Sequence, residues 1–168
     1  MKAFLAVLLV SIFWAPCFSS AKISSKGEIE INQFFLDLTQ SLNQKNPDLI
    51  AALFKVDGEL ITLAGGIYKG RNEIKSLFGE SFAGPFKDVS YEHFVQFIRF
   101  TDTHHVIVDG VWKIANPDSS KNSCGLFVFN LSKVNGSWKI DLSYSSEPRQ
   151  GHTAEHGRTV SWTEICKK

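Results

Sequence analysis

The chain has 168 residues and a formal net charge of +1, with 18 basic residues against 17 acidic ones. No basic patch or stripe stands out, so nucleic acid and anionic membrane surfaces are poor candidate partners. The length is sufficient for one domain with a substantial core, and no apolar run after residue 21 is long enough to span a membrane.

Residues 1–21 have the pattern of a secretory signal peptide. Lys2 supplies the positive charge, Ala3 to Trp14 is apolar but too short to span a bilayer, and Ser19-Ser20-Ala21 fits a cleavage site before Lys22. We therefore expect a periplasmic or secreted protein that is not attached to the membrane after cleavage. The expected chain then comprises a domain over residues 22–148 and a polar tail over residues 149–168.

The N-terminal half of this domain carries helical signals. A capping box at Ser25 to Glu28 is followed by an apolar stripe at helical spacing. The stripe consists of Ile31, Phe34, Phe35, Leu38 and Leu42. Asn46-Pro47 opens a short second helix that ends before Asp57-Gly58, and Gly70 opens a third. Two short strands are expected between them, at Glu59 to Leu63 and at Ile67-Tyr68.

The C-terminal half is rich in aromatic and β-branched residues, which favour strands. Strands are expected at Val89 to Phe100 and Val106 to Ala115, followed by a polar loop and a hairpin that turns at Asn135-Gly136. Counting from this turn pairs Leu131 with Ile140, and Phe129 with Leu142. One face of the hairpin then carries Phe127, Phe129, Leu131, Trp138, Ile140, Leu142 and Tyr144. The order of elements predicts an α+β fold with N-terminal helices packed on a bent antiparallel sheet.

With these elements in place, the sequence resembles the nuclear transport factor 2-like superfamily over Ile29 to Ser146. Within it, the chain is most similar to the SnoaL-like branch, which includes SgcJ/EcaC-type proteins. The matching residues are Asn46, Leu53, Phe54, Asp57, Gly70, Ile74, Phe78, Gly110, Trp112, Gly125, Trp138, Ile140, Ser145 and Ser146.

The resemblance implies a cone-shaped barrel in which the concave face of the sheet and the helices enclose a pocket. Members of the superfamily include isomerases, cyclases, dehydratases, hydrolases, binding proteins and dimerisation modules, so the fold alone does not give the function. Relatives often pair through their convex sheets, which implies a homodimer. Relatives also often carry His where this chain has Tyr144, and a phenol is a poor base at neutral pH.

Two carboxylates are candidates for catalysis in such a pocket. Asp57 and Asp109 would act as bases if apolar walls tuned their pKa values. The alternative for Asp57 is an exposed strand start, and the alternative for Asp109 is the convex face of the sheet. Arg99 is a candidate clamp for a carboxylate ligand, with a solvated position at the rim as its alternative.

Four aromatic residues are candidates for binding a ligand. Tyr68, Trp112, Phe127 and Tyr144 would give apolar walls, some with polar tips. The alternative is that they are ordinary core aromatics.

No metal ion or cofactor is expected. His152 to His156 matches the H-x-x-E-H pattern of inverted zinc proteases, but it lies between Gly151 and Gly157 in the polar tail, where a stable helix is not expected. His104-His105 fits an exposed turn. Cys124 and Cys166 are either joined by a disulfide, which export to an oxidising compartment would permit, or remain two thiols.

Three functions remain open at this point. The first is an exported domain that binds a small, largely apolar molecule. The second is a small-molecule isomerase, cyclase or hydrolase that uses Asp57 or Asp109. The third is a dimerisation module without a ligand.

Overall fold

The structure is a computed structural model and describes residues 25–147 of the chain. The elements run in the order α1 (Ser25–Asn43), α2 (Pro47–Leu53), β1 (Phe54–Ile61), β2 (Ile67–Lys69), α3 (Gly70–Ala83), β3 (Ser90–Phe100), β4 (His105–Ala115), η1 (Ser119–Lys121), β5 (Ser123–Val134) and β6 (Ser137–Ser146). No helix in this range is long and apolar enough to cross a membrane. The predicted signal peptide and the polar tail lie outside the described residues.

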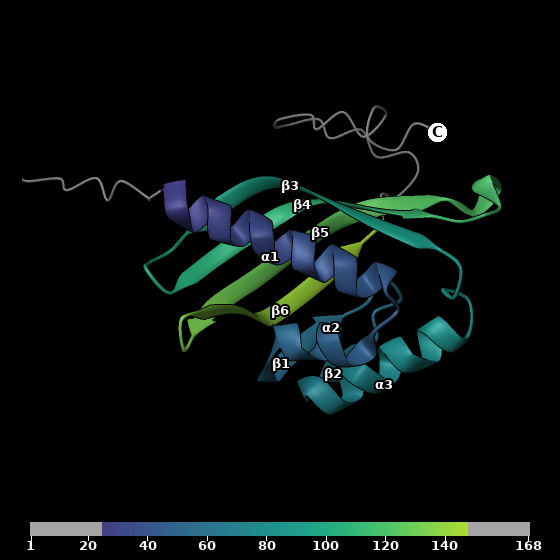
Figure 1. The fold of residues 1–168 in the computed structure, drawn as a ribbon, viewed down its shortest axis with the longest axis horizontal. Coiled ribbons are helices and arrows are strands. Elements are labelled where there is room, and N and C mark those ends of the chain that lie inside the picture. Colours follow the sequence, from purple (N-terminus) through teal and green to yellow (C-terminus); the bar gives the residue numbers. More distant parts are fainter. Residues whose placement is uncertain (1–24, 148–168) are drawn as a thin grey trace, which may run out of the picture.

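All six strands form one curved sheet in the order β2-β1-β6-β5-β4-β3. Strands β3 to β6 form the predicted antiparallel meander, and β1 also pairs antiparallel with β2. The sheet is nevertheless mixed, because β1 runs parallel to the free edge of β6. Figure 1 shows α1 lying across the sheet, with α2 and α3 beside β1 and β2. The predicted α+β architecture is therefore confirmed, with one parallel pair added.

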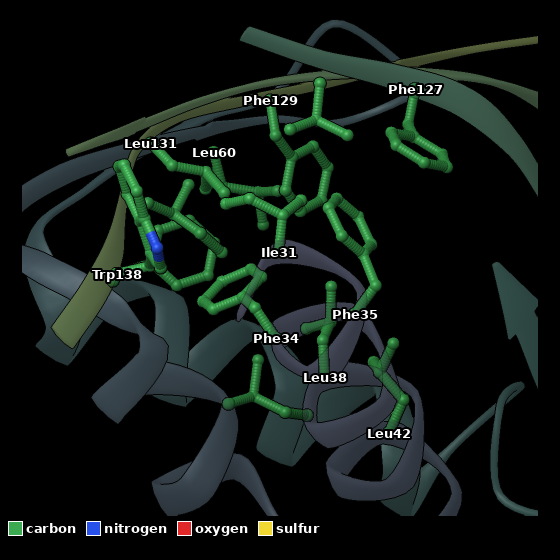
Figure 2. Packing of buried hydrophobic residues seen from close by; sticks show 14 of the residues in the cluster. Ile31, Phe34, Phe35, Leu38, Leu42, Leu60, Phe127, Phe129, Leu131 and Trp138 are labelled. Carbon is green, nitrogen blue, oxygen red and sulfur yellow. The ribbon is translucent and has the colours of Figure 1, made fainter. Parts of the chain in front are cut away.

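The core lies between α1 and the face of the sheet that we call concave. The predicted apolar stripe of α1 is buried, and its side chains meet those of the central strands (Figure 2). The sheet contributes Val106, Val108, Phe127, Phe129, Leu131, Trp138 and Ile140. A 3.6-residue stripe packed on alternating strand residues is the usual solution for one helix on one sheet face.

The second helix begins as predicted, but the strand after it begins earlier than predicted. The Asn46 side chain accepts a hydrogen bond from the Leu49 amide at 3.1 Å, with Pro47 at the start of the helix. Strand β1 starts at Phe54 rather than Glu59. Phe54 is buried in the core, and its carbonyl accepts a hydrogen bond from Arg71 Nε at 2.8 Å, which fixes the chain in its extended conformation.

The hairpin of β5 and β6 follows the predicted register only near its turn. Leu131 pairs with Ile140, but Asp141 is an extra residue, so Phe129 pairs with Ser143 rather than Leu142. Such a bulge reverses the side-chain alternation of every later residue. The predicted positions of Leu142 and Tyr144 on the concave face are therefore wrong, and Ser143 is buried there instead.

Two glycines allow large rings to lie flat against the sheet. A Cβ at Gly125 would stand 2.4 Å from Trp112 Cζ2, and one at Gly110 would stand 2.7 Å from Phe127 Cζ. Both distances are too short for non-bonded carbon atoms, so only glycine fits beneath these rings.

Candidate functional site

A groove between α1 and β3 is the candidate binding site. It has a volume of about 400 Å³. Its lining residues are Asn32, Phe35, Leu36, Thr39, Glu92, His93, Phe94 and Val95. Asn32 and Phe35, like Leu36 and Thr39, are three positions apart, and Phe35 and Thr39 are four apart, so the four α1 residues share one side of the helix. Four consecutive β3 residues contribute because β3 is the last strand of the sheet and its outer edge has no strand partner among the described residues.

Thr39 and His93 form a polar pair within this groove. Thr39 Oγ1 and His93 Nδ1 are 2.9 Å apart and form a hydrogen bond. The imidazole ring also packs against Phe127 and Phe35, with ring centroids 5.6 Å and 6.2 Å away. Burial among these rings lowers the pKa of His93 to about 4, since it penalises the charged imidazolium. His93 is therefore neutral at neutral pH.

The groove adjoins the aromatic centre of the core through its lining residue Phe35. Phe35 stacks on Phe127 at 5.1 Å, and Phe127 meets Phe129 edge-on at 5.3 Å. Figure 2 shows the Phe35 ring pointing from α1 toward the sheet residues Phe127 and Phe129. These rings fill the space between α1 and the sheet at this point. A ligand would therefore rest over the aromatic centre, between α1 and the edge of β3.

Asp57 is exposed to solvent. Its side chain is 81% exposed on β1, and Lys55 Nζ is 3.8 Å from its carboxylate. It borders a separate groove of about 450 Å³ that also contains Arg71 and Lys139. Asp57 is therefore not enclosed by the apolar walls that the catalytic hypothesis requires.

Asp109 lies on the opposite, convex face of the sheet. Its neighbours across the strands are Phe97 and Val128, and its carboxylate lies 3.3 Å from Arg99 Nη1. Arg99 thus pairs with a carboxylate of the chain itself. The structure does not bring Asp57 and Asp109 together, and neither lines the α1–β3 groove.

The four aromatic candidates are also separated. Phe127 and Trp112 are buried on the concave face, where the Trp112 indole Nε1–H donates to the Leu126 carbonyl at 3.0 Å. Tyr68 lines a third groove beside α3, and Tyr144 is 43% exposed on the convex face. None of the four lines the α1–β3 groove, but Phe127 packs against two residues that do, Phe35 and His93.

Sequence reasoning missed Thr39 and His93. The signal that could have found them is the alternation along β3, which places Tyr91, His93 and Val95 on one face, together with the four-residue spacing of Phe35 and Thr39. The pairing of the two elements could not be deduced, because a helix on a sheet face can shift along it without changing either pattern.

The remaining candidates fall into two groups. His104 lies in the predicted exposed turn, and His105 is the exposed first residue of β4, with its Nδ1 2.8 Å from Asp102 Oδ2. Residues 25–147 contain no group of three or more His, Cys, Asp or Glu side chains that could hold a metal ion. Cys124 is disulfide-bonded. Its partner lies outside the described residues, as does the H-x-x-E-H pattern, and the pairing with Cys166 stays a prediction.

Comparison with solved structures of other proteins identifies the fold of this chain. No protein-family profile and no curated protein matches the chain. Solved structures do match. A cystatin-like domain of unknown function from Nostoc punctiforme has a TM-score of 0.68 and 22% identity, over 75% of this chain and 80% of that one. An NTF-2 like protein of unknown function from Shewanella oneidensis has a TM-score of 0.64 and 16% identity, over 72% and 99%.

A third match is a protein provisionally named as a scytalone dehydratase, from Novosphingobium aromaticivorans. It has a TM-score of 0.64 and 21% identity, over 79% of this chain and 90% of that one. These identities are too low to carry a function across. They show that the chain has the nuclear transport factor 2-like cone fold that its resemblance to this superfamily implies.

Proposed function

We propose that this chain is an exported, SnoaL-like protein that binds a small, largely apolar molecule in the α1–β3 groove. The volume of about 400 Å³ falls within the usual range for small-molecule sites. The walls are largely apolar, through Phe35, Leu36, Phe94 and Val95. This combination is typical of sites that gain affinity from apolar burial and orient the ligand with few polar groups.

The observation that carries the proposal is the hydrogen-bonded Thr39–His93 pair in the lining of this groove. A hydrogen-bonded polar pair set among apolar side chains gives a ligand one oriented contact. A groove with apolar walls alone would bind less selectively.

The same residues favour binding over catalysis. A general base works best when its pKa lies near the operating pH, and the pKa of His93 is about 4. Asp57 and Asp109 lie elsewhere on the surface of the sheet. The alternative is an enzyme that uses Asp57 or Asp109. It would be supported if the protein turned over a small molecule and if Asp57→Asn or Asp109→Asn abolished that turnover.

Export follows from the signal-peptide pattern of residues 1–21. Expression of the full chain in a bacterial host, followed by N-terminal sequencing of the exported protein, tests it. We expect the exported chain to begin at Lys22.

Ligand binding is tested by native mass spectrometry of freshly purified protein. A co-purified small molecule is expected as a discrete mass above that of the chain. Leu36→Asp should reduce its retention, because Leu36 lines the groove and is 63% exposed, so the substitution leaves the core intact.

Ile29→Asp is the matched control. Ile29 is an equally exposed apolar residue on the same helix, at 67%, but it does not line the groove. Equal loss of the bound molecule in both variants would contradict binding in the α1–β3 groove.

A further inference from the structure

The hydrogen-bond geometry around Thr39 fixes which nitrogen of His93 carries its proton. Thr39 Oγ1 lies 2.7 Å from the Phe35 carbonyl oxygen and 2.9 Å from His93 Nδ1. A carbonyl only accepts, and a hydroxyl has only one proton to donate. Once the hydroxyl donates to the carbonyl, its oxygen must accept from His93 Nδ1–H.

The second nitrogen of the ring is then a lone-pair acceptor. A neutral imidazole has one N–H, and here it is on Nδ1, so Nε2 is unprotonated. Burial keeps the ring neutral at neutral pH. His93 therefore presents an acceptor and no free donor.

This acceptor is open to the groove. Among residues 25–147, His93 forms its side-chain hydrogen bond through Nδ1, and no buried side-chain nitrogen or oxygen there lacks a partner. Since Nε2 is not one of the buried atoms and His93 lines the groove, Nε2 is accessible to a bound molecule.

The charges around the groove indicate which molecules fit. Among residues 25–147, its lining includes one charged residue, Glu92, and no Lys or Arg. A carboxylate ligand would meet a negative side chain and a lone pair, with no cation among the described lining residues to neutralise it. An uncharged ligand with an O–H group would instead complete the hydrogen bonding of His93.

We infer that the α1–β3 groove selects uncharged apolar molecules that carry a hydroxyl donor, with His93 Nε2 as the acceptor and Thr39 as the residue that positions its tautomer. This inference rests on the proposed binding function and narrows the class of ligand. Ethers and carboxylates of the same shape bind less well, because neither can donate to Nε2.

Three probes of one shape test the inference: 4-butylphenol, 4-butylanisole and 4-butylbenzoate, titrated into the exported chain and followed by NMR. A single neutral hydrogen bond is worth on the order of a three- to tenfold difference in affinity. We expect the phenol to bind more tightly than the anisole by roughly this factor, and the benzoate to bind most weakly.

Variants of His93 isolate the acceptor. His93→Asn places an amide donor near Thr39 but leaves nothing at the position of Nε2, so the ratio of phenol to anisole affinity should fall to about one. His93→Gln extends an amide to that position and should restore part of the preference. An unchanged ratio in His93→Asn would overturn the inference.

Thr39→Val tests the positioning role. The isosteric valine removes the acceptor for Nδ1–H, so the ring is free to adopt either tautomer and the anisole should gain affinity relative to the phenol. ¹⁵N NMR of the free protein gives a readout that needs no ligand, because Nε2 of His93 should resonate as an unprotonated nitrogen. A protonated Nε2 in the wild-type protein would contradict the assignment.

The outcomes separate the inference from the proposed function. If phenol and anisole bind equally and both lose affinity in Leu36→Asp, the groove binds apolar molecules but His93 does not select among them. If no probe binds the wild-type protein, the proposed function and the inference both fail.

Discussion

Glu30 on α1 and Trp138 on β6 are joined by a hydrogen bond, in which the indole Nε1–H donates to Glu30 Oε2 at 3.1 Å. Lys133 Nζ donates to the same carboxylate oxygen at 2.6 Å and lies 5.2 Å from the centre of the Trp138 ring. The hydrogen bonds from Lys133 and Trp138, together with the positive charge of Lys133, lower the pKa of Glu30. The contact ties the first helix to the hairpin at the opposite end of the chain.

Trp138 is buried as predicted, and Trp138→Ala should lower the free energy of unfolding by about 3–5 kcal/mol, the usual cost of emptying a buried aromatic site. Trp138→Phe should cost less, because it keeps most of the ring volume and loses the bond to Glu30. Equilibrium unfolding in urea measures both. A loss below about 1 kcal/mol for the alanine variant would show that Trp138 is not part of the core.

His93 should make stability fall in mildly acidic solution. The unfolded chain takes up a proton at His93 below its ordinary pKa of about 6.5, whereas the folded chain resists protonation until about pH 4. The unfolded state thus binds more protons in this window, so stability falls from pH 6.5 toward pH 4, by about 2–3 kcal/mol.

The contribution of His93 is the difference between the wild-type protein and His93→Phe, which keeps the ring packing and cannot titrate. Urea unfolding at several pH values between 4 and 7 measures it. Glu92, the other titratable residue that lines the groove, is present in both proteins and cancels. Parallel pH curves for the two proteins would contradict the depressed pKa of His93.

Exposed apolar residues on the convex face of the sheet lead us to expect a homodimer. Val128 and Tyr144 are cross-strand partners there, and both are more than one-third exposed. Paired apolar side chains on an open sheet face are typical of surfaces that bind another copy of the chain. Sedimentation velocity at micromolar concentration should show a dimer that Tyr144→Arg converts to monomer.

Val134→Arg is the control for this dimer, because Val134 is similarly exposed but lies at the hairpin turn. It should leave the dimer intact. A wild-type protein that sediments only as a monomer would rule the dimer out.

Cys124 should be paired with Cys166 in the exported chain. Cys124 is disulfide-bonded, and Cys166 is the cysteine that remains after removal of residues 1–21. In the chain-entropy model, a bond that closes a loop of about forty residues contributes about 3–4 kcal/mol to stability. Thiol titration of the denatured, unreduced protein should find no free thiol, and peptide mapping should recover the linked pair. Two free thiols per chain would refute the bond.

Periodicity predicted the fold better than it predicted the site. The stripe from Ile31 to Leu42 and the meander from β3 to β6 follow from 3.6- and 2-residue spacing, which local sequence encodes. The parallel β1–β6 pair and the Thr39–His93 contact depend on how distant elements dock. Nothing in the local pattern specifies that docking.

The hairpin shows the same limit within a single element. The Asn135-Gly136 turn fixed the pairs next to it correctly, and the error began where Asp141 was inserted. The extra residue is stabilised by partners outside the local pattern, since Asp141 accepts from Ser132 Oγ at 3.0 Å and pairs with Lys55 at 2.7 Å. The prediction that Tyr144 binds a ligand rested on the unbroken count.

The extra residue at Asp141 also affects how β6 can be compared with the same strand in relatives. Deleting that one residue would place Leu142 directly after Ile140 and keep Ser143 opposite Phe129, so the inward-facing residues of β6 would stay the same. A relative that lacks this codon would therefore present the same interior on a regular strand without the bulge. Relatives aligned along β6 without allowance for that codon would have their inward- and outward-facing residues interchanged.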